Sequence, residues 1–354
     1  MKNFFKNKTY SAAIVGFGNI AYFLDKYHPP MISTHYSAYL KNSKIRSVSV
    51  CDINDKKVFR ENLPQKINIY HDLDQMMTKE KPEIVSICSP DSTHIKVLRK
   101  ILRYSSVKGI WCEKPIATKR SDALEMVSLC KKKKVKLVVN YIRQYDPFYQ
   151  FLRKNMNRIV GEIQEVICLY SGGLATSGSH MLDLLQSFFG MPEQVYSVKE
   201  KRGSYFSNLR YKQFIVRLIP FECKKISIFE LNIFGSKARM DILNKPFGDY
   251  EYRYFPLKSN ESLGINYYSA KSRNIIAKKF KRIFFENALK DIINSIEKNR
   301  LPVSSGSNSL KSLELMGAIF YSTKIGKEIK IPFNSFNYQI PKPGGDVKKW
   351  KNLR

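Results

Sequence analysis

Two hydrophobic patterns divide the chain near residue 150. From Ser11 to Asn140, short β-branched apolar runs alternate with segments that carry apolar residues at helical spacing. This rhythm is typical of a parallel sheet whose strands are joined by crossover helices, and the uninterrupted apolar runs indicate that both sheet faces are covered. The predicted strands are residues 12–15, 45–51, 67–70, 84–88, 110–112 and 136–139, with helices at 94–103 and 122–130.

After residue 150 the strand-like stretches lengthen and follow one another with few helices between them. They are residues 163–170, 195–199, 214–219 and 225–233, and helices return at 285–296 and 309–323. This order indicates a largely antiparallel or mixed sheet. We therefore predict an α/β chain with a doubly wound domain over residues 1–145 and an α+β domain with an open sheet over 146–340. The last helices should pack back near the first domain, and 341–354 form a basic tail.

A glycine-rich turn follows the first predicted strand directly, in the segment Gly16-Phe17-Gly18-Asn19-Ile20-Ala21. It has the G-x-G-x-x-A spacing of the Rossmann dinucleotide fingerprint, in the strand-to-helix context that this motif requires. The first glycine makes the tight turn, and the second lets backbone N–H groups approach a pyrophosphate. We expect Gly16, Phe17, Gly18, Asn19 and Ile20 to bind a dinucleotide.

Asp52 ends the second predicted strand, where it can accept hydrogen bonds from the hydroxyls of an adenosine ribose and repel a 2′-phosphate. This position favours NAD over NADP, although an ordinary strand-terminal Asp is the alternative. Lys56, Lys57 and Arg60 leave NADP open. The spacing from the glycines exceeds the usual value of about 20 residues, and the extra length lies in an apparent insertion at 25–34, before the helix continues.

Two further segments lie at the carboxyl ends of predicted strands, where open α/β sheets bind ligands. Ser89 and Pro90 close the fourth strand, and Glu113-Lys114-Pro115 closes the fifth. A Lys in such a cleft can donate a hydrogen bond to a substrate oxygen or lower the pKa of a reacting hydroxyl. The alternative is a surface Lys paired with Glu113.

A second candidate group sits in the later half of the chain. The glycine-rich segment 171–179 leads into an amphipathic helix that ends at Gly190, and His180 lies in its first turn. A His there can act as a general base near neutral pH, although a lone His is more often a satisfied structural group.

Composition adds a large positive charge, with 61 Lys and Arg against 30 Asp and Glu and a formal net charge of +31. Such a charge suits nucleic acid, an acidic membrane surface or a phosphorylated substrate. The lysines are spread along the chain, which favours a compositional bias, and no recognition motif for nucleic acid accompanies them. The absence of a long apolar run predicts no membrane span and a cytoplasmic protein. The six widely spaced cysteines signal neither disulfides nor a metal site.

Together these elements resemble the Gfo/Idh/MocA family of glucose-fructose oxidoreductases and inositol dehydrogenases, from about Ala13 to about Pro332. The elements that carry the resemblance are the glycine-rich start, Ser89-Pro90 with His94, Glu113-Lys114-Pro115, Gly178-Ser179-His180 with Asp183, Phe234-Gly235-Ser236 followed by Lys237 and Arg239, and Leu301-Pro302-Val303. The resemblance implies an NAD-dependent oxidoreductase that transfers hydride to or from a carbinol carbon of a sugar-type substrate. It also implies that the second domain binds the substrate and that its sheet packs against another subunit.

The resemblance assigns roles to single residues. Lys114 would polarise the substrate oxygen, and His180 would exchange the hydroxyl proton. Substrate contacts would come from Arg143, Tyr145, Thr176 and Asp183, and further cofactor contacts from Ser89, Pro90, His94, Glu113 and Lys114.

One position departs from the family pattern, because Thr176 stands where many members carry an Asp four residues before the catalytic His. A hydroxyl can hold an oxygen but cannot exchange a proton at neutral pH. The enzyme could therefore work with Lys114 and His180 alone, or the chain could be a nucleotide-binding regulator or scaffold. The insertion with Ser33-Thr34-His35 resembles a branch associated with bacterial surface glycans, which favours a sugar phosphate or nucleotide sugar as the substrate.

Overall fold

The computed structural model describes residues 8–27, 32–54, 67–200, 204–221, 226–244, 250–274, 283–333 and 338–340. The chain forms two compact units. The first comprises residues 1–146 and 282–310, and the second comprises 147–281 and 311–354. The two units are described separately below.

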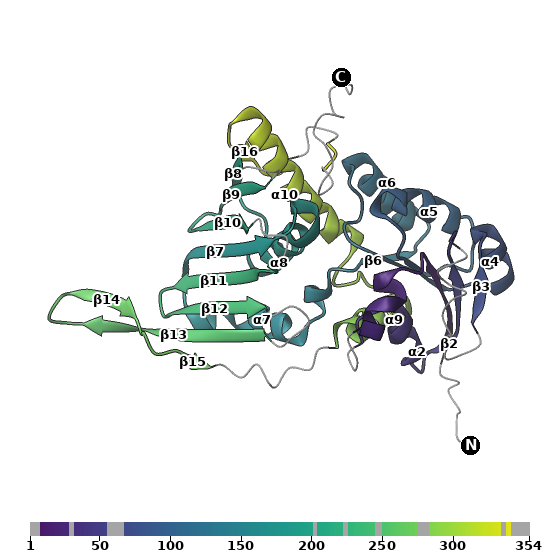
Figure 1. Ribbon diagram of the computed structural model, residues 1–354, viewed down its shortest axis with the longest axis horizontal. Helices are drawn as coiled ribbons and strands as arrows, with labels where there is room; N and C mark the ends of the chain where they lie inside the picture. Colours follow the sequence, from purple (N-terminus) through teal and green to yellow (C-terminus); the bar gives the residue numbers. More distant parts are fainter. Residues whose placement is uncertain are drawn as a thin grey trace, which may run out of the picture. The chain divides into compact units, whose positions relative to one another are not determined.

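The first unit is built on a six-stranded, all-parallel sheet with the order β3-β2-β1-β4-β5-β6 (Figure 1). This is the Rossmann order, in which the direction of winding reverses between β1 and β4. The prediction of a doubly wound parallel sheet is confirmed. The strands are β1 (Tyr10–Val15), β2 (Ile45–Cys51), β3 (Asn68–Tyr70), β4 (Ile84–Ile87), β5 (Gly109–Cys112) and β6 (Lys136–Val139).

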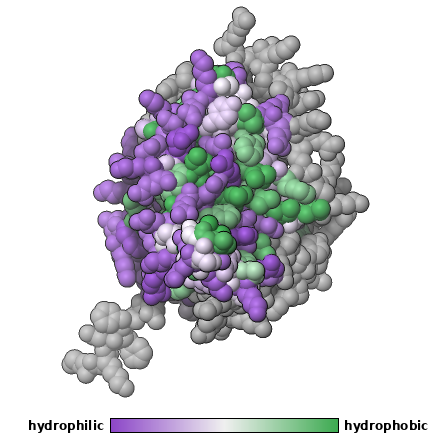
Figure 2. Space-filling model, turned by 90° about the vertical axis from the view of Figure 1, so that its left-hand side faces the viewer, coloured by the Kyte–Doolittle hydropathy of each residue, from purple (hydrophilic) through white to green (hydrophobic). Residues whose placement is uncertain are grey.

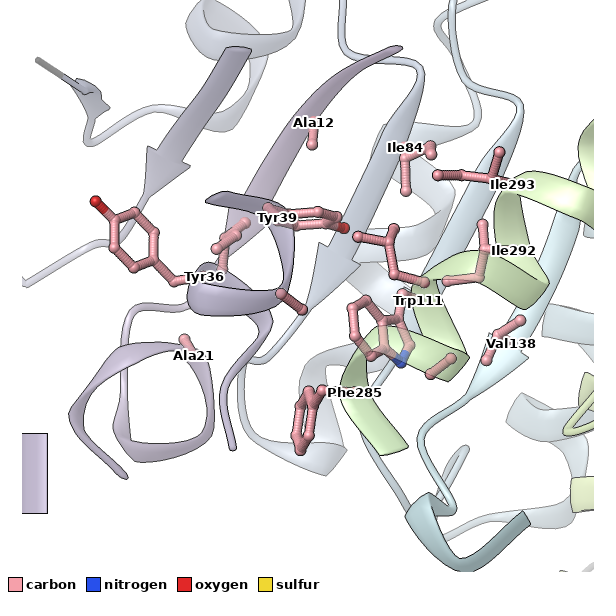
Figure 3. Close-up of a cluster of buried hydrophobic side chains, with 14 of the residues drawn as sticks. Ala12, Ala21, Tyr36, Tyr39, Ile84, Trp111, Val138, Phe285, Ile292 and Ile293 are labelled. Carbon is pink, nitrogen blue, oxygen red and sulfur yellow. The ribbon is translucent and has the colours of Figure 1, made fainter. Parts of the chain in front are cut away.

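Helices surround this sheet, and one of them comes from a distant part of the sequence. The helices are α1 (Leu24–Tyr27), α2 (His35–Leu40), α4 (Leu73–Glu80), α5 (His94–Ile101), α6 (Arg120–Lys132) and α9 (Phe284–Glu297), with the short turns η1 (Asn19–Phe23), η2 (Asp91–Thr93) and η3 (Ile142–Gln144). Figure 3 shows Phe285 and Ile292 of α9 beside Trp111 of β5 in the buried core, with Tyr39 of α2 close by. The aromatic core of the unit therefore lies directly beneath the carboxyl ends of β4 and β5.

The second unit contains a ten-stranded mixed sheet with the order β14-β13-β12-β11-β7-β10-β9-β8-β16, with β15 paired to β13. Strands β7 and β10 are parallel, and the other pairs are antiparallel. The prediction of a mixed sheet is confirmed. The strands are β7 (Ile163–Ser171), β8 (Gln194–Lys199), β9 (Tyr205–Arg210), β10 (Ile215–Phe221), β11 (Phe229–Gly235), β12 (Ala238–Asn244), β13 (Tyr250–Asn260), β14 (Ile265–Tyr268), β15 (Arg273–Asn274) and β16 (Ile329–Lys330).

One face of this sheet is buried and the other is more open, as the alternation in β11 shows. Phe229, Leu231 and Ile233 are buried, whereas the residues between them are only half-buried. The helices of this unit are α7 (Pro147–Val160), α8 (Ser179–Phe189) and most of α10 (Gly306–Ile325), with the turn η4 (Leu174–Gly178). The predicted amphipathic helix after the glycine-rich segment is confirmed as α8, which ends before Gly190.

Candidate functional site

The glycine-rich turn is fixed by backbone contacts at its first glycine. Gly16 has a φ of +88°, and a Cβ at this position would lie 2.7 Å from the backbone nitrogen of Ser89. Its own N–H donates to the carbonyl of Cys51 at 2.8 Å. Only glycine tolerates both the positive φ and the close approach of the Ser89 backbone. At Gly18, by contrast, an added Cβ would meet no atom within 4 Å, which leaves the open approach that a pyrophosphate needs.

Asp52 is held against this turn at the end of β2. Its Oδ2 accepts a 2.6 Å hydrogen bond from the backbone N–H of Phe17, and its Oδ1 accepts one of 2.8 Å from Asn54. A carboxylate oxygen can accept two hydrogen bonds, so each oxygen keeps capacity for a ribose hydroxyl. Lys56, Lys57 and Arg60 lie outside the described residues.

The helix after the glycines is interrupted, as predicted from the insertion. The turn η1 begins at Asn19, α1 follows at once, and α2 starts only at His35. Asp25 stabilises the junction, since its two carboxylate oxygens accept hydrogen bonds from the N–H of Ser33 and the hydroxyl of Thr34, each at 2.5 Å. Thr34 also caps α2.

The loop after β4 is held by hydrogen bonds of its own side chains. Ser89 shares a 2.7 Å hydrogen bond with the hydroxyl of Thr93, and Pro90 is exposed beside it. The ring of His94 is buried, with Nε2 3.0 Å from the carbonyl of Ser89 and Nδ1 3.2 Å from that of Ile116. His94 therefore links the loops after β4 and β5, and this position argues against the direct cofactor contact that the sequence suggested.

Glu113, directly after β5, is clamped by its neighbours. Oε1 lies 3.0 Å from Nε2 of His35 and accepts a 2.6 Å hydrogen bond from the side-chain amide of Asn140. Oε2 accepts a weaker one from the backbone N–H of Lys114. Burial would raise the pKa of Glu113, but the hydrogen bonds from His35 and Asn140 and the positive charge of Lys114 hold it below its usual value. Glu113 is thus an ionised, fully engaged carboxylate.

Lys114 stands beside this clamp with its ammonium group available. Within the described ranges, Nζ of Lys114 has no hydrogen-bond or ion-pair partner, so it is not the surface Lys paired with Glu113 that was the alternative. Burial lowers the pKa of Lys114, and Arg143 adds to the decrease, while the charges of Glu113 and Asp91 oppose it. A half-buried cation without a partner is costly to maintain, which marks Lys114 as a group prepared for a ligand.

Arg143 and Tyr145, both predicted to contact substrate, differ in their surroundings. Arg143 is half-buried in η3 and close enough to influence Lys114. The side chain of Tyr145 is 1% exposed, and its hydroxyl donates to Asp291 at 3.0 Å and accepts from the backbone N–H of Ser304 at 3.2 Å. Tyr145 therefore joins η3 to α9 and the segment after it, which argues against substrate contact.

The remaining predicted residues lie in the second unit. Thr176 is in η4, where its hydroxyl donates to the carbonyl of Gly173 at 2.8 Å and so closes its own loop. His180 is half-buried in the first turn of α8, as predicted. Asp183, one turn later, is buried, accepts a 3.3 Å hydrogen bond from Ser312 and raises the pKa of Arg153, which burial lowers. Asp183 thus balances the charge of a half-buried arginine of α7.

Three residues of the site were not predicted from the sequence, namely His35, Ser86 and Asn140. Asn140 follows β6 in the same way that Glu113 follows β5, so its position at a strand end was a usable signal. Ser86 is a single polar residue inside the apolar run of β4, and it lies 2.9 Å from Nδ1 of His35. Nothing in the sequence pairs these two residues.

The comparisons with known proteins agree with this geometry. Residues 10–141 match the model of the Gfo/Idh/MocA family, described as an oxidoreductase family with an NAD-binding Rossmann fold. The first unit therefore carries the NAD-binding Rossmann region of this oxidoreductase family. The match covers the sheet that carries Gly16, Asp52 and Lys114, and it confirms the predicted family and NAD as the cofactor class.

Single proteins with a similar sequence or a similar fold were also found. The chain is 26% identical over 214 residues to D-glucoside 3-dehydrogenase of Escherichia coli, which covers 54% of this chain and 57% of the relative. The chain spans about half the length or less of the curated relatives it matches. Two solved structures share the fold at 17% identity. One is a putative NADPH-dependent oxidoreductase of Desulfitobacterium hafniense (TM-score 0.76, 92% and 98% covered), and the other is the WlbA dehydrogenase of Bordetella pertussis with NADH and UDP-GlcNAcA (TM-score 0.74, 93% and 99% covered).

The rest of the described chain adds few other chemical features. No described helix is long and apolar enough to cross a membrane. The described residues contain no group of three or more His, Cys, Asp or Glu side chains arranged to hold a metal ion. The five cysteines in the described ranges are free thiols.

Proposed function

We propose that this protein is an NAD-dependent dehydrogenase that acts on a CH–OH group of a sugar, sugar phosphate or nucleotide sugar. The observation that carries the proposal is Lys114. Its side chain is half-buried at the carboxyl edge of a Rossmann sheet, its amine has a lowered pKa, and the amine has no partner among the described residues. A cation without a partner at this edge suits the polarisation of a substrate oxygen, so we favour catalysis over the regulatory alternative.

The residues around the glycine turn fit a dinucleotide. Gly18 leaves open space, and the backbone N–H groups of Asn19 and Ile20, at the start of η1, would face the pyrophosphate. Asp52, already oriented by Phe17 and Asn54, would accept the ribose hydroxyls. The same carboxylate would repel a 2′-phosphate, so we propose NAD as the preferred cofactor. Bound NAD supplies hydride transfer at its nicotinamide ring.

The chain itself would supply orientation and proton transfer. Lys114 would donate a hydrogen bond to the substrate oxygen, which favours the alkoxide character that develops as hydride leaves the carbon. His180 would take the hydroxyl proton during oxidation and return it during reduction. Arg143, which influences Lys114, would add positive charge for an anionic substrate. Thr176 already donates within its own loop, so we assign it at most an accepting role.

The substrate class rests on relatives and on charge. The curated relatives include a D-glucoside dehydrogenase and an inositol dehydrogenase, and one structural neighbour was solved with a nucleotide sugar. A net charge of +31 would attract phosphorylated substrates. We therefore propose a phosphorylated or nucleotide-linked sugar, with surface-glycan synthesis as the pathway class.

We also propose that the second sheet mediates assembly into a homo-oligomer. Figure 2 views the molecule from the left-hand side of Figure 1 and shows a green apolar area bordered by purple hydrophilic residues. Exposed apolar residues of this sheet include Tyr196, Val198 and Phe221. Contiguous apolar surface of this kind is typical of protein interfaces. Sedimentation velocity of the purified protein would measure the oligomeric state.

The first experiment is a fluorescence titration with NADH and NADPH, followed by a screen of sugar phosphates and nucleotide sugars for NAD reduction. We expect NADH to bind more tightly than NADPH, and turnover to disappear in Lys114→Met. Asp72→Asn is the matched control, because Asp72 caps α4 in the same unit and should leave binding unchanged. Absence of binding by either dinucleotide would overturn the proposal.

A further inference from the structure

A continuous chain of hydrogen bonds lies inside the first unit and ends on Glu113. The hydroxyl of Tyr39 is 2.7 Å from Oγ of Ser86, and that oxygen is 2.9 Å from Nδ1 of His35. The opposite nitrogen, Nε2, is 3.0 Å from Glu113 Oε1. The donors can all point the same way, with each hydroxyl donating onward and Nε2–H donating to the carboxylate. This hydrogen-bond chain joins α2, β4 and the end of β5.

His35 is the central member and is enclosed by aromatic rings. Its side chain is fully buried, its ring centroid is 4.0 Å from that of Trp111, and Phe285 packs edge-on at 5.5 Å. Trp111 in turn donates to the side-chain oxygen of Asn140 at 3.1 Å, which orients the amide that binds Glu113. Buried polar groups are stable only when they are satisfied. This network meets that requirement and fixes both donors to Oε1.

Fixed donors keep the carboxylate charged where burial alone would favour its protonated form. The Glu113 side chain is only 12% exposed, yet its pKa lies below the usual value because His35 and Asn140 bind it. The negative charge of Glu113 also acts on Lys114. It raises the pKa of Lys114, whereas burial and the charge of Arg143 lower it.

We propose that His35 is a positioning residue for Lys114, because it orients Glu113 as a carboxylate whose negative charge favours the protonated form of the neighbouring lysine. The value of this arrangement to the reaction rests on the proposed function, in which the ammonium group binds the substrate oxygen. The effect of the Glu113 charge on the protonation of Lys114 does not depend on the proposed function. His35 touches neither Lys114 nor the reacting atoms, and it acts through Glu113 alone.

Among the described residues, the charged and titratable groups that act on the pair come from η2, η3 and α2 and from the ends of β4 and β5. Lys114 is influenced by Glu113 beside it, Asp91 of η2 and Arg143 of η3. Glu113 is influenced by His35 of α2 and by Lys114, and it adds to the increase that desolvation causes in the pKa of the thiols of Cys88 and Cys112. The substitutions below leave Asp91 and Arg143 unchanged, so a change at Lys114 reports on Glu113.

Competitive labelling with acetic anhydride, read by mass spectrometry from pH 6 to 10, measures the neutral fraction of each lysine in the cofactor-free protein. In Glu113→Gln we expect a lower Lys114 pKa, because the opposing negative charge is lost, and roughly tenfold more neutral amine. In His35→Leu we expect a shift in the same direction, with about threefold more neutral amine at pH 7. The difference should grow toward acid pH, where the unclamped Glu113 binds a proton.

Three controls separate this effect from general damage. Lys44, paired with Glu297 at 2.7 Å, should label identically in every variant. His35→Gln should restore much of the wild-type profile, because its amide can donate to Glu113. Tyr39→Phe removes the far end of the same buried chain without touching Glu113, so it should lower stability but leave Lys114 unchanged.

The double variant His35→Leu/Glu113→Gln decides whether His35 acts through Glu113. We expect Lys114 in the double variant to label with the same pH dependence as in Glu113→Gln alone, because the carboxylate through which His35 acts is already absent. The proposal is overturned if His35→Leu labels like wild type while Glu113→Gln is shifted, or if its effect persists in the double variant. No dinucleotide or substrate is used, so a failure to find turnover would reject the proposed function and leave this result intact.

Discussion

The backbone N–H of Phe17 donates a 2.6 Å hydrogen bond to Oδ2 of Asp52, which ties the glycine-rich turn to the end of β2. The bond joins residues 35 positions apart, and it means that the acidic residue is oriented before any ligand arrives. Preorganised groups lose less freedom on binding. The same carboxylate therefore has a structural task and a proposed ligand-binding task, and substitutions must separate them.

Asp52→Asn should weaken NADH binding by about tenfold to a hundredfold, because hydrogen bonds to a charged group contribute about 1.5–3 kcal/mol. NADPH should be affected less, since the charge that repels its 2′-phosphate is removed. Fluorescence titration with both dinucleotides measures the two affinities. Equal losses for the two would contradict the assignment of Asp52 to the ribose. Asp72→Asn, which changes only a helix cap, should bind as wild type.

The two glycines of the turn should respond differently to alanine. Gly16→Ala forces a Cβ into a left-handed φ of +88° and onto the backbone of Ser89, so we expect a loss of stability of at least about 2 kcal/mol. Gly18→Ala meets no atom within 4 Å and should keep the wild-type melting temperature while it weakens NADH binding. Thermal unfolding beside NADH titration tests both. A destabilised Gly18→Ala would mean that this glycine serves the fold.

The first sheet could be predicted nearly to its strand ends, because β1, β4, β5 and β6 are buried on both faces and read as plain apolar runs. The second sheet could be predicted only in part. Its strand β13 carries Lys, Arg and Glu between its tyrosines and forms no apolar run, and it was not predicted. Helix α7 was also missed, although Phe148, Leu152 and Met156 repeat at helical spacing, since Arg and Asn residues fill the positions between them.

Site residues at strand ends were accessible to sequence reasoning, whereas pairs between distant segments were not. Lys114 was found because it lies two residues after the end of β5. The contact of His35 with Glu113 spans 78 positions, and that of Tyr145 with Asp291 spans 146. A single sequence holds no signal for such pairings. For this reason the sequence predicted Tyr145 at the substrate and gave no sign of its contacts in the core of the first unit.

Lys114→Met should stabilise the cofactor-free protein at neutral pH by about 1 kcal/mol. Because burial lowers the pKa of Lys114 in the folded state below its ordinary value of 10.5, the unfolded chain binds the proton more tightly, and the ionised lysine destabilises the fold. The gain should shrink as pH rises toward 10.5, where both states become neutral. Urea unfolding at pH 7 and pH 10 measures the difference in the free energy of unfolding between the variant and the wild type. A destabilised variant would show that Lys114 has a structural partner.

Glu113→Gln should cost about 2 kcal/mol at pH 7, since it removes the charge that His35 and Asn140 bind. The folded pKa of Glu113 is depressed, so its contribution is present above its ordinary value of 4.5 and is lost as pH falls through the folded value. The gap to wild type should therefore narrow by pH 4 in urea unfolding. Glu125→Gln, at an exposed pair with Arg99, should leave the unfolding midpoint unchanged. A gap of the same size at both pH values would argue against the clamp.

Tyr145→Phe tests whether this residue serves the core or the substrate. The variant loses the hydroxyl that bridges Asp291 and the backbone N–H of Ser304, so we expect it to lose about 1–2 kcal/mol of stability. Its KM for a substrate found by the sugar screen should stay within about twofold of wild type, because uniform binding contacts are unchanged. Tyr267→Phe, at an exposed tyrosine of β14, is the matched control and should alter neither quantity. An increased KM at unchanged stability would instead place the Tyr145 hydroxyl at the substrate, and the hydrogen bonds to Asp291 and Ser304 would then have to open on binding.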